Sequence, residues 1–255
     1  MTGRDYHYLV RVRRLAPGEV FPVLLPGGVE ACVRIQSVDG GVLTGVCEAE
    51  ESGRPGRPLP PIVLFQALPK GSKMDLIVRQ AAEGGLAEVV PFASEYSVPR
   101  DGAGEEKIRR WERIIREARQ QSGSRIATVL HRPLSMDGLF DYWEELKSRP
   151  LPDARNPQNP RRAPKQSLGL FFHQSPLAEA GLHDYLESNP EIVAFAVGPE
   201  GGFSSAEAAL FQAAGFKALT IGDTVLRTET AALYGAAAIR TILLERTLWM
   251  RSGNE

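Results

Sequence analysis

Apolar residues in the first quarter of the chain come in short runs separated by turn sequences. Residues 7–48 fit short strands because Pro-Gly, Gly-Gly and Asp-Gly pairs interrupt them at strand-like spacing. The runs 31–35 and 42–46 fit two paired strands that flank the turn at Asp39 and Gly40. We therefore predict a small β-barrel domain over residues 1–60.

From residue 61 onward, compact apolar runs alternate with helical periodicity. Strands are predicted at 62–65, 88–90, 168–172 and 192–197. Helices are predicted around the stripe Met74, Ile77, Val78 and Ala81, and at 105–121, 137–147, 177–187 and 230–249. Alternating strands and helices predict a mainly parallel sheet covered on both faces, so residues 61–255 are expected to form an α/β domain.

Two glycine-containing loops follow strands late in the chain and lead into helices. The first spans residues 198–202 and the second runs from 222 to 230. Glycines let backbone N–H groups approach a ligand, and open α/β sheets bind ligands at the carboxyl ends of their strands. Neither loop has the spacing of a Walker loop or a dinucleotide fingerprint. We therefore predict a shared pocket for a different cofactor.

The charged and hydroxyl residues in and after these loops call for separate interpretations. Ser204 and Glu207 form a capping box for the following helix, so Glu207 is assigned no catalytic role. Glu200 has no evident structural role, with a solvated loop acid or salt-bridge partner as the alternative. Glu229 is favoured near a helix N-terminus by the dipole, whereas Arg227 is disfavoured there and suggests an anionic partner. Thr228 or Thr230 is expected to cap this helix.

Composition excludes several classes of protein. The hydrophobic fraction of 43%, the charged fraction of 24% and the net charge of −1 are typical of a globular protein. The four histidines share no ligand spacing, so no metal is expected. Two cysteines outside any redox motif, and the lack of an apolar leader or membrane-length segment, favour a cytoplasmic protein without membrane contact. The five prolines of residues 149–166 indicate a loop that is either mobile or functional.

The two loops together resemble the RsmE-type RNA methyltransferases of the SPOUT superfamily. The matching segments are 198–204 and 226–231, with further likeness at 66–74, 118–123 and the N-terminal motif around His7. The resemblance implies an N-terminal PUA-like β-barrel that binds RNA and a trefoil-knotted methyltransferase domain. It also implies a homodimer that uses S-adenosylmethionine to methylate N3 of one uridine in the decoding region of 16S ribosomal RNA, in the small ribosomal subunit.

The resemblance and the chemistry of N3 methylation together assign residues to roles. Loss of the N3 proton leaves negative charge, so Arg227 is expected to stabilise it, with Glu200 as candidate base and Glu229 behind it. The expected cofactor contacts are Phe172, His173, Val197, Gly198, Pro199, Gly201, Gly202, Ile221, Gly222, Leu226, Arg227 and Thr230. The expected RNA contacts are Arg4, His7, Arg11, Arg13, Arg14, Arg116, Gln121 and Arg125. Solvated helix faces are the alternative explanation for the basic clusters.

The chain departs from the family pattern at a few positions. Tyr96 and Thr224 stand where arginines are usual, and Gly84 stands where leucine is usual. The replacements at Tyr96 and Thr224 leave open a non-catalytic RNA-binding or assembly factor on the same fold. Two further alternatives are a SPOUT ribose 2′-O-methyltransferase, whose usual asparagine-valine-serine run is missing from 226–231, and a small-molecule α/β enzyme. The sequence leaves open which nucleotide is the target and which residue acts as the general base. It also leaves open whether the substrate is free RNA or an assembled subunit.

Overall fold

The computed structural model describes residues 1–24, 30–48, 59–97, 104–150, 166–174, 177–220 and 222–252. The chain divides into two compact units, Met1–Gly56 and Arg57–Glu255. Each unit is described by itself.

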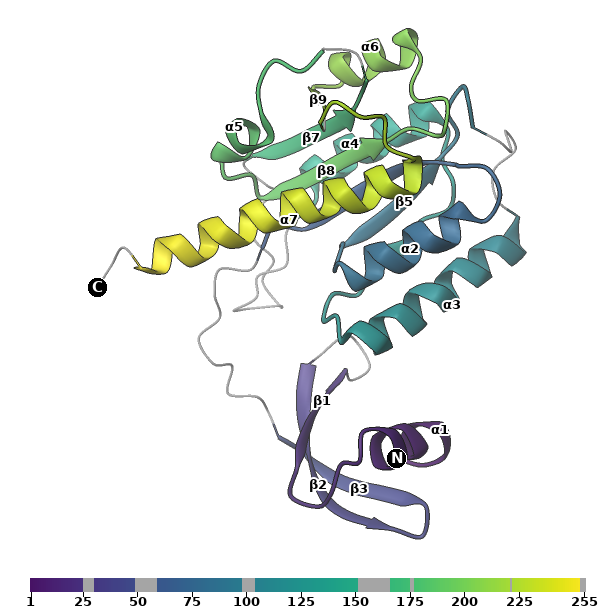
Figure 1. Ribbon diagram of the computed structural model, residues 1–255, viewed down its shortest axis with the longest axis vertical. Coiled ribbons are helices and arrows are strands. Elements are labelled where there is room, and N and C mark those ends of the chain that lie inside the picture. Colours follow the sequence, from purple (N-terminus) through teal and green to yellow (C-terminus); the bar gives the residue numbers. More distant parts are fainter. Residues whose placement is uncertain are drawn as a thin grey trace. The chain divides into compact units, whose positions relative to one another are not determined.

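The first unit contains a three-stranded antiparallel sheet (Figure 1). Its strands are β1 (Val20–Leu24), β2 (Glu30–Asp39) and β3 (Val42–Glu48), and β2 turns into β3 through Gly40 and Gly41, which both have positive φ. Arg34 pairs with Val46 and Ile35 with Gly45, which confirms the predicted pairing of 31–35 with 42–46. Closure of this sheet into a barrel stays a prediction.

The prediction of strand structure from residue 7 onward is wrong at its start. The chain begins with α1 (Gly3–Tyr6) and continues in η1 (His7–Val12), a π-helix. Leu9 is the buried residue of η1, and it packs into a small core with Phe21, Ile35 and Leu43. A strand is held extended when alternate side chains are buried. Residues 7–12 bury Leu9 alone, so the packing of Leu9 into the small core decides their local structure.

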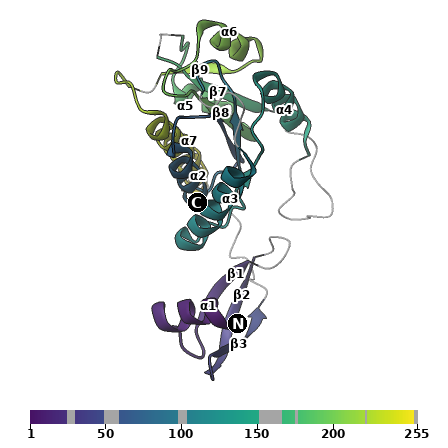
Figure 2. The ribbon, with the colours of Figure 1, turned by 90° about the vertical axis from the view of Figure 1, so that its right-hand side faces the viewer.

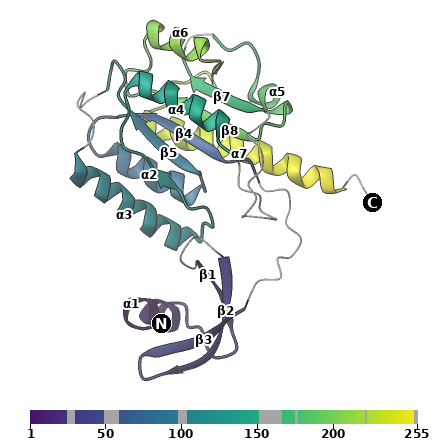
Figure 3. The ribbon, with the colours of Figure 1, turned by 180° about the vertical axis from the view of Figure 1, so that it is seen from behind.

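The second unit is built on a six-stranded parallel sheet with the strand order β6-β5-β4-β8-β7-β9 (Figures 1 and 3). The strands are β4 (Ile62–Ala67), β5 (Glu88–Phe92), β6 (Val129–Leu130), β7 (Ser167–Phe172), β8 (Ile192–Val197) and β9 (Lys217–Leu219). Every residue of the central strands β4 and β8 is buried. The predicted α/β class and parallel sheet are confirmed.

Helices cover both faces of this sheet, as Figure 2 shows edge-on. One face packs against α2 (Lys73–Glu83), α3 (Glu105–Ser122) and α7 (Thr228–Ser252), with α5 (Leu182–Glu187) beside α7. The other face carries α4 (Met136–Ser148) and α6 (Ser205–Ala213) over a core rich in phenylalanine. No helix in the described part of the chain is both long enough and apolar enough to cross a membrane.

Most helix predictions are confirmed, with two boundary corrections. The stripe of Met74, Ile77, Val78 and Ala81 is buried in α2, and α3 ends at Gly123, whose φ of 69° is left-handed. The helix predicted over 177–187 forms only at Leu182–Glu187, because the Asp184 carboxylate accepts the Gly181 N–H at 2.9 Å and fixes the start there. The last helix begins at Thr228 rather than at residue 230. Residues 151–165 of the Pro-rich loop lie outside the described residues.

The small residues of α7 let the helix approach the sheet closely. A Cβ atom on Gly235 would lie 2.3 Å from Cζ of Phe172, at the end of β7. Intrachain packing, one of the two explanations for these small residues, therefore applies at Gly235.

We predict that Gly235→Ala destabilises the protein although alanine is the better helix former. The helix propensity gain of about 1 kcal/mol is outweighed by a clash that costs about 1–3 kcal/mol. The matched control is Gly138→Ala in α4. The nearest atom to a Cβ there is Ser135 Oγ at 3.3 Å, and the next is Leu134 Cβ at 3.7 Å, an ordinary contact distance. Thermal unfolding of both variants would contradict the prediction if Gly235→Ala were at least as stable as Gly138→Ala.

Candidate functional site

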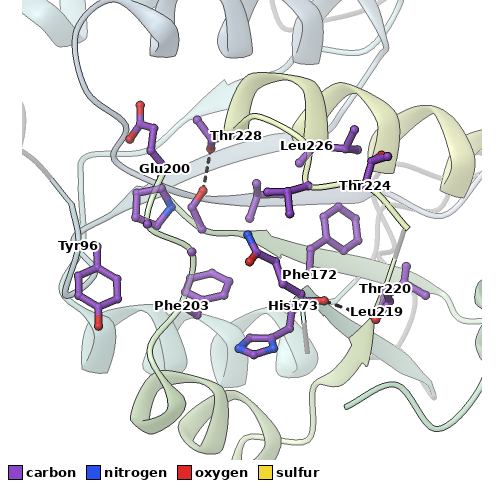
Figure 4. Close-up of a pocket in the computed structure, with 18 of the residues that line it drawn as sticks. Tyr96, Phe172, His173, Glu200, Phe203, Leu219, Thr220, Thr224, Leu226 and Thr228 are labelled. Atoms are coloured by element: carbon purple, nitrogen blue, oxygen red, sulfur yellow. Dashed lines mark hydrogen bonds between the residues drawn. The ribbon is translucent and has the colours of Figure 1, made fainter. Parts of the chain in front are cut away.

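A cavity of about 450 Å³ opens at the carboxyl ends of β7, β8 and β9 (Figure 4). Its walls come from three parts of the chain. The first loop and its flanking residues line one wall (197–205), the end of β9 and the second loop line another (219, 220, 222–226 and 228), and Phe172, His173 and Gln174 follow β7. Tyr96 lies at the rim (Figure 4). The two glycine-containing loops therefore share one pocket.

The structure brings together most of the predicted cofactor contacts. The predicted contacts that line the cavity are Phe172, His173, Val197, Gly198, Pro199, Gly201, Gly202, Gly222 and Leu226. Arg227 and Thr230 are exposed and are not among its described lining residues, and Ile221 lies outside the described residues.

The first loop is a tight turn that requires two of its glycines. The N–H of Gly202 donates to the Pro199 carbonyl at 2.9 Å, and Gly202 has a φ of 70°. A Cβ on Gly198 would lie 3.0 Å from the carbonyl carbon of Gly202. A side chain at either position would therefore strain the loop or push it open.

A buried hydrogen-bond chain fixes this loop to the rest of the sheet. The fully buried Gln66 donates from Nε2 to Thr228 Oγ1 at 3.0 Å, and the Thr228 hydroxyl donates to the Gly198 carbonyl at 2.7 Å (Figure 4). Gln66 Nε2 also donates to the Ala67 carbonyl at 2.9 Å. The chain of bonds joins β4, the first residue of α7 and the first loop.

This arrangement changes the role assigned to Thr228 and adds Gln66 to the site. The Thr228 hydroxyl holds Gly198 and Gln66, so it is engaged across the sheet rather than only at the end of its own helix. Gln66 was not predicted to belong to the site. The signal that could have found it is a polar amide near the end of the otherwise apolar run of β4.

Glu200 is bound by the segment that leads into α2. Its Oε1 lies 2.6 Å from Lys73 Nζ, and both carboxylate oxygens accept the Lys70 N–H at 3.2 and 3.3 Å. Partial burial alone would raise the pKa of Glu200, but the Lys73 ammonium and the backbone N–H groups outweigh burial and hold the pKa below its usual value. Glu200 is therefore an ionised anchor at neutral pH.

Glu229 belongs to the same charged cluster. Its Oε2 lies 3.9 Å from Lys73 Nζ and is buried without a hydrogen-bond partner among the described residues. The Lys73 ammonium thus lies between the carboxylate of Glu200, in the first loop, and that of Glu229, in the second. Lys73, which was not predicted to take part, connects the first loop to the beginning of α7.

Glu207 has a second function beyond its confirmed capping box. Its Oε2 accepts the Ser204 N–H at 2.9 Å while its own N–H donates to Ser204 Oγ at 3.3 Å. The other oxygen, Oε1, accepts the Glu95 N–H at 2.8 Å. The buried Glu207 therefore ties the turn after β5 to the helix that follows the first loop.

The predicted RNA contacts fall in both units of the chain. In the first unit His7, Arg11, Arg13 and Arg14 are exposed, and the side chain of Arg4 lies outside the described residues. In the second unit Arg116, Gln121 and Arg125 are exposed on α3 or just after it. All the described members are thus accessible to a partner. The residues that the structure describes contain no group of three or more His, Cys, Asp or Glu able to hold a metal ion.

A family model and the curated relatives of this chain indicate the same protein family. The sequence model of the RNA methyltransferase domain matches residues 57–240. The ribosomal RNA small subunit methyltransferase E of Synechocystis is 31% identical over 244 residues, which is 95% of this chain and 73% of the relative.

Two solved structures share the fold. The ribosomal RNA small subunit methyltransferase E of Neisseria gonorrhoeae, bound to S-adenosyl methionine, is 24% identical with a TM-score of 0.68, over 93% of this chain and 89% of the other. A putative methyltransferase from Legionella pneumophila, with the cofactor SAM bound, is 26% identical with a TM-score of 0.65, over 94% of this chain and 90% of the other.

We predict that Thr228→Val loosens the first loop. Valine keeps the shape of threonine but leaves Gln66 Nε2 with one partner fewer and the Gly198 carbonyl without its donor, at a cost of about 1–3 kcal/mol. The matched control is Thr241→Val, at an exposed position of the same helix. Equal denaturant midpoints for the two variants would show that the buried hydroxyl contributes nothing.

Proposed function

Since the chain belongs to the RNA methyltransferase family and to its ribosomal RNA small subunit methyltransferase E members, we propose that it methylates small-subunit ribosomal RNA with S-adenosylmethionine as donor. The observation that carries the proposal is the pocket formed jointly by the two glycine-containing loops. Its volume lies in the range of small-molecule sites, about 300–1,000 Å³.

The chemistry of the pocket suits this donor. Phe172, Val197 and Leu226 offer apolar surface for an adenine ring, and the loop backbone offers polar groups close at hand. The chemistry that the bound donor would supply is an electrophilic methyl group on a sulfonium.

We propose N3 of a uridine in the decoding region of 16S ribosomal RNA as the acceptor. This nitrogen must lose its proton before it attacks, and the resulting charge spreads onto the neighbouring carbonyl oxygens. A nearby cation stabilises that charge. The guanidinium of Arg227 is suited to the task because it is exposed beside the pocket, and no carboxylate in the described part of the chain pairs with it.

Glu200 is proposed as a positioning residue in place of the base that its sequence context suggested. A base needs a pKa near the working pH, whereas the pKa of Glu200 is below its usual value. Its contacts with Lys70 and Lys73 instead hold the first loop in place. Glu229 shares Lys73 and is proposed to support the same arrangement.

The remaining proposals concern partners. The exposed arginines of the first unit and of α3 would contact phosphates, and such binding weakens as salt rises. Leu233, Tyr234 and Leu244 leave apolar surface exposed on α7, which supports a homodimer. We also propose a trefoil knot in the second unit, an RNA-binding role for the first unit, and a cytoplasmic location.

The test of the function is mass spectrometry of small-subunit ribosomal RNA from a strain that lacks the protein. We expect the N3-methyluridine of the decoding region to disappear and to return when the purified protein and S-adenosylmethionine are added to subunits from that strain. An unchanged nucleotide in the deletion strain would refute the target, and a lost ribose 2′-O-methyl group would move the proposal to that chemistry.

Arg227→Ala is expected to lower kcat by about 10²–10³ while S-adenosylmethionine still binds, because the lost charge acts on the developing negative charge. The matched control is Arg79→Ala, an exposed arginine of α2. Single-turnover methyl transfer together with calorimetry separates the two effects. A kcat equal to that of the control would remove Arg227 from the mechanism.

Glu200→Gln is expected to weaken S-adenosylmethionine binding about tenfold with a smaller change in kcat, since the ion pair to Lys73 holds the loop that lines the pocket. Lys73→Met should act alike, and the double variant should bind no more weakly than either single one. Unchanged affinity with a large loss of kcat and an altered pH profile would restore Glu200 as the base.

A further inference from the structure

Tyr96 is an aromatic side chain held at the rim of the pocket with much of its surface free. It is 46% exposed, and it lines the cavity. Its hydroxyl has no hydrogen-bond partner in the part of the chain that the structure describes. Because Tyr96 lines the pocket, the exposed part of its ring is accessible to a ligand there.

The backbone that carries Tyr96 is tightly fixed. Ser94 and Ser97 are buried on either side of it, the Ser97 N–H donates to the Ser94 carbonyl at 3.0 Å, and the Ser94 N–H donates to Ser97 Oγ at 3.1 Å. The preceding N–H, that of Glu95, donates to Glu207. The turn is thus anchored to itself and to α6.

The side chain itself rests on the first loop. A Cβ on Gly201 would lie 3.0 Å from Cβ and 3.1 Å from Cγ of Tyr96. Glycine at 201 therefore permits the ring to lie against the loop backbone. One part of the ring is supported by Gly201, and the remainder is open to a ligand.

The position of the ring points to the second reactant rather than to the methyl donor. Figure 4 shows Tyr96 apart from Phe172 and Leu226, which lie together on the other side of the cavity. A base that leaves an RNA stack regains its lost contacts on an aromatic face, and a rigid ring loses little entropy in providing one.

We propose that Tyr96 is the stacking platform for the RNA base that receives the methyl group, which makes it a positioning residue for the acceptor. The inference rests on the proposed function. It differs from a general RNA contact because it requires the ring and not the hydroxyl.

The kinetic test compares Tyr96→Phe with Tyr96→Leu on small subunits from the deletion strain. Phenylalanine keeps the ring and is expected to retain kcat/KM for the subunit within about twofold. Leucine keeps apolar bulk without a π-face and is expected to lower kcat/KM by about fivefold to 100-fold, the range set by loss of one base–aromatic stack. The affinity for S-adenosylmethionine should stay unchanged in both. Equal kcat/KM for the two variants would overturn the proposal, and a parallel loss of donor affinity would assign the ring to the donor.

A spectroscopic test separates this inference from the proposed function. In Tyr96→Trp, a uridine-containing RNA oligonucleotide should quench the added tryptophan emission relative to the wild-type protein, whose three tryptophans give the baseline. Quenching would support stacking even if the wild-type protein transferred no methyl group to subunits. Such a lack of transfer would refute the proposed function but not the stacking. Absence of quenching at RNA concentrations that saturate binding would overturn the stacking platform.

Discussion

The buried amide of Gln66 sets the geometry of the pocket. Burying an amide costs free energy unless its groups find partners, and Gln66 finds one of them in Thr228, 162 residues further along the chain. Because the Thr228 hydroxyl continues to the Gly198 carbonyl, the start of α7 and the first loop share one reference point in the sheet. The two loops therefore close on one cavity, although residues 203–221 separate them in the sequence.

Local patterns predict the helices and strands of the second unit because burial there follows the period of each element. The stripe of α2 and the apolar face of α3 are buried as expected. Prediction fails where a contact distant in sequence decides the local structure. Leu9 is drawn into a small core and η1 forms where strand was expected, while Thr228 enters α7 because its side chain bonds across the sheet.

The candidate site also has a part that local sequence predicts and a part that it does not. Glycine punctuation after β8 and after β9 predicts both loops, and most of the expected lining residues do face the cavity. Glu200 and Glu207 were singled out from the sequence, but their partners were missed, since Lys73 meets Glu200 across 127 positions and Glu95 meets Glu207 across 112. Glu207 has a local explanation as a cap residue and Glu200 has none, but neither local sequence names a distant partner. Only the folded chain shows that they act in pairs.

The same pairings distribute charge around the pocket. With its pKa below the usual value, Glu200 stays ionised throughout the neutral range, and the stabilisation from its pairing is lost only as the pH falls through that lowered pKa. The Lys73 ammonium is correspondingly committed to Glu200 and Glu229. A loop anchor that does not titrate near neutral pH can hold the donor without competing for the proton of the acceptor. The exposed Arg227 follows the lining residue Leu226 and has no carboxylate partner among the described residues, as its proposed role in stabilising the acceptor's negative charge requires.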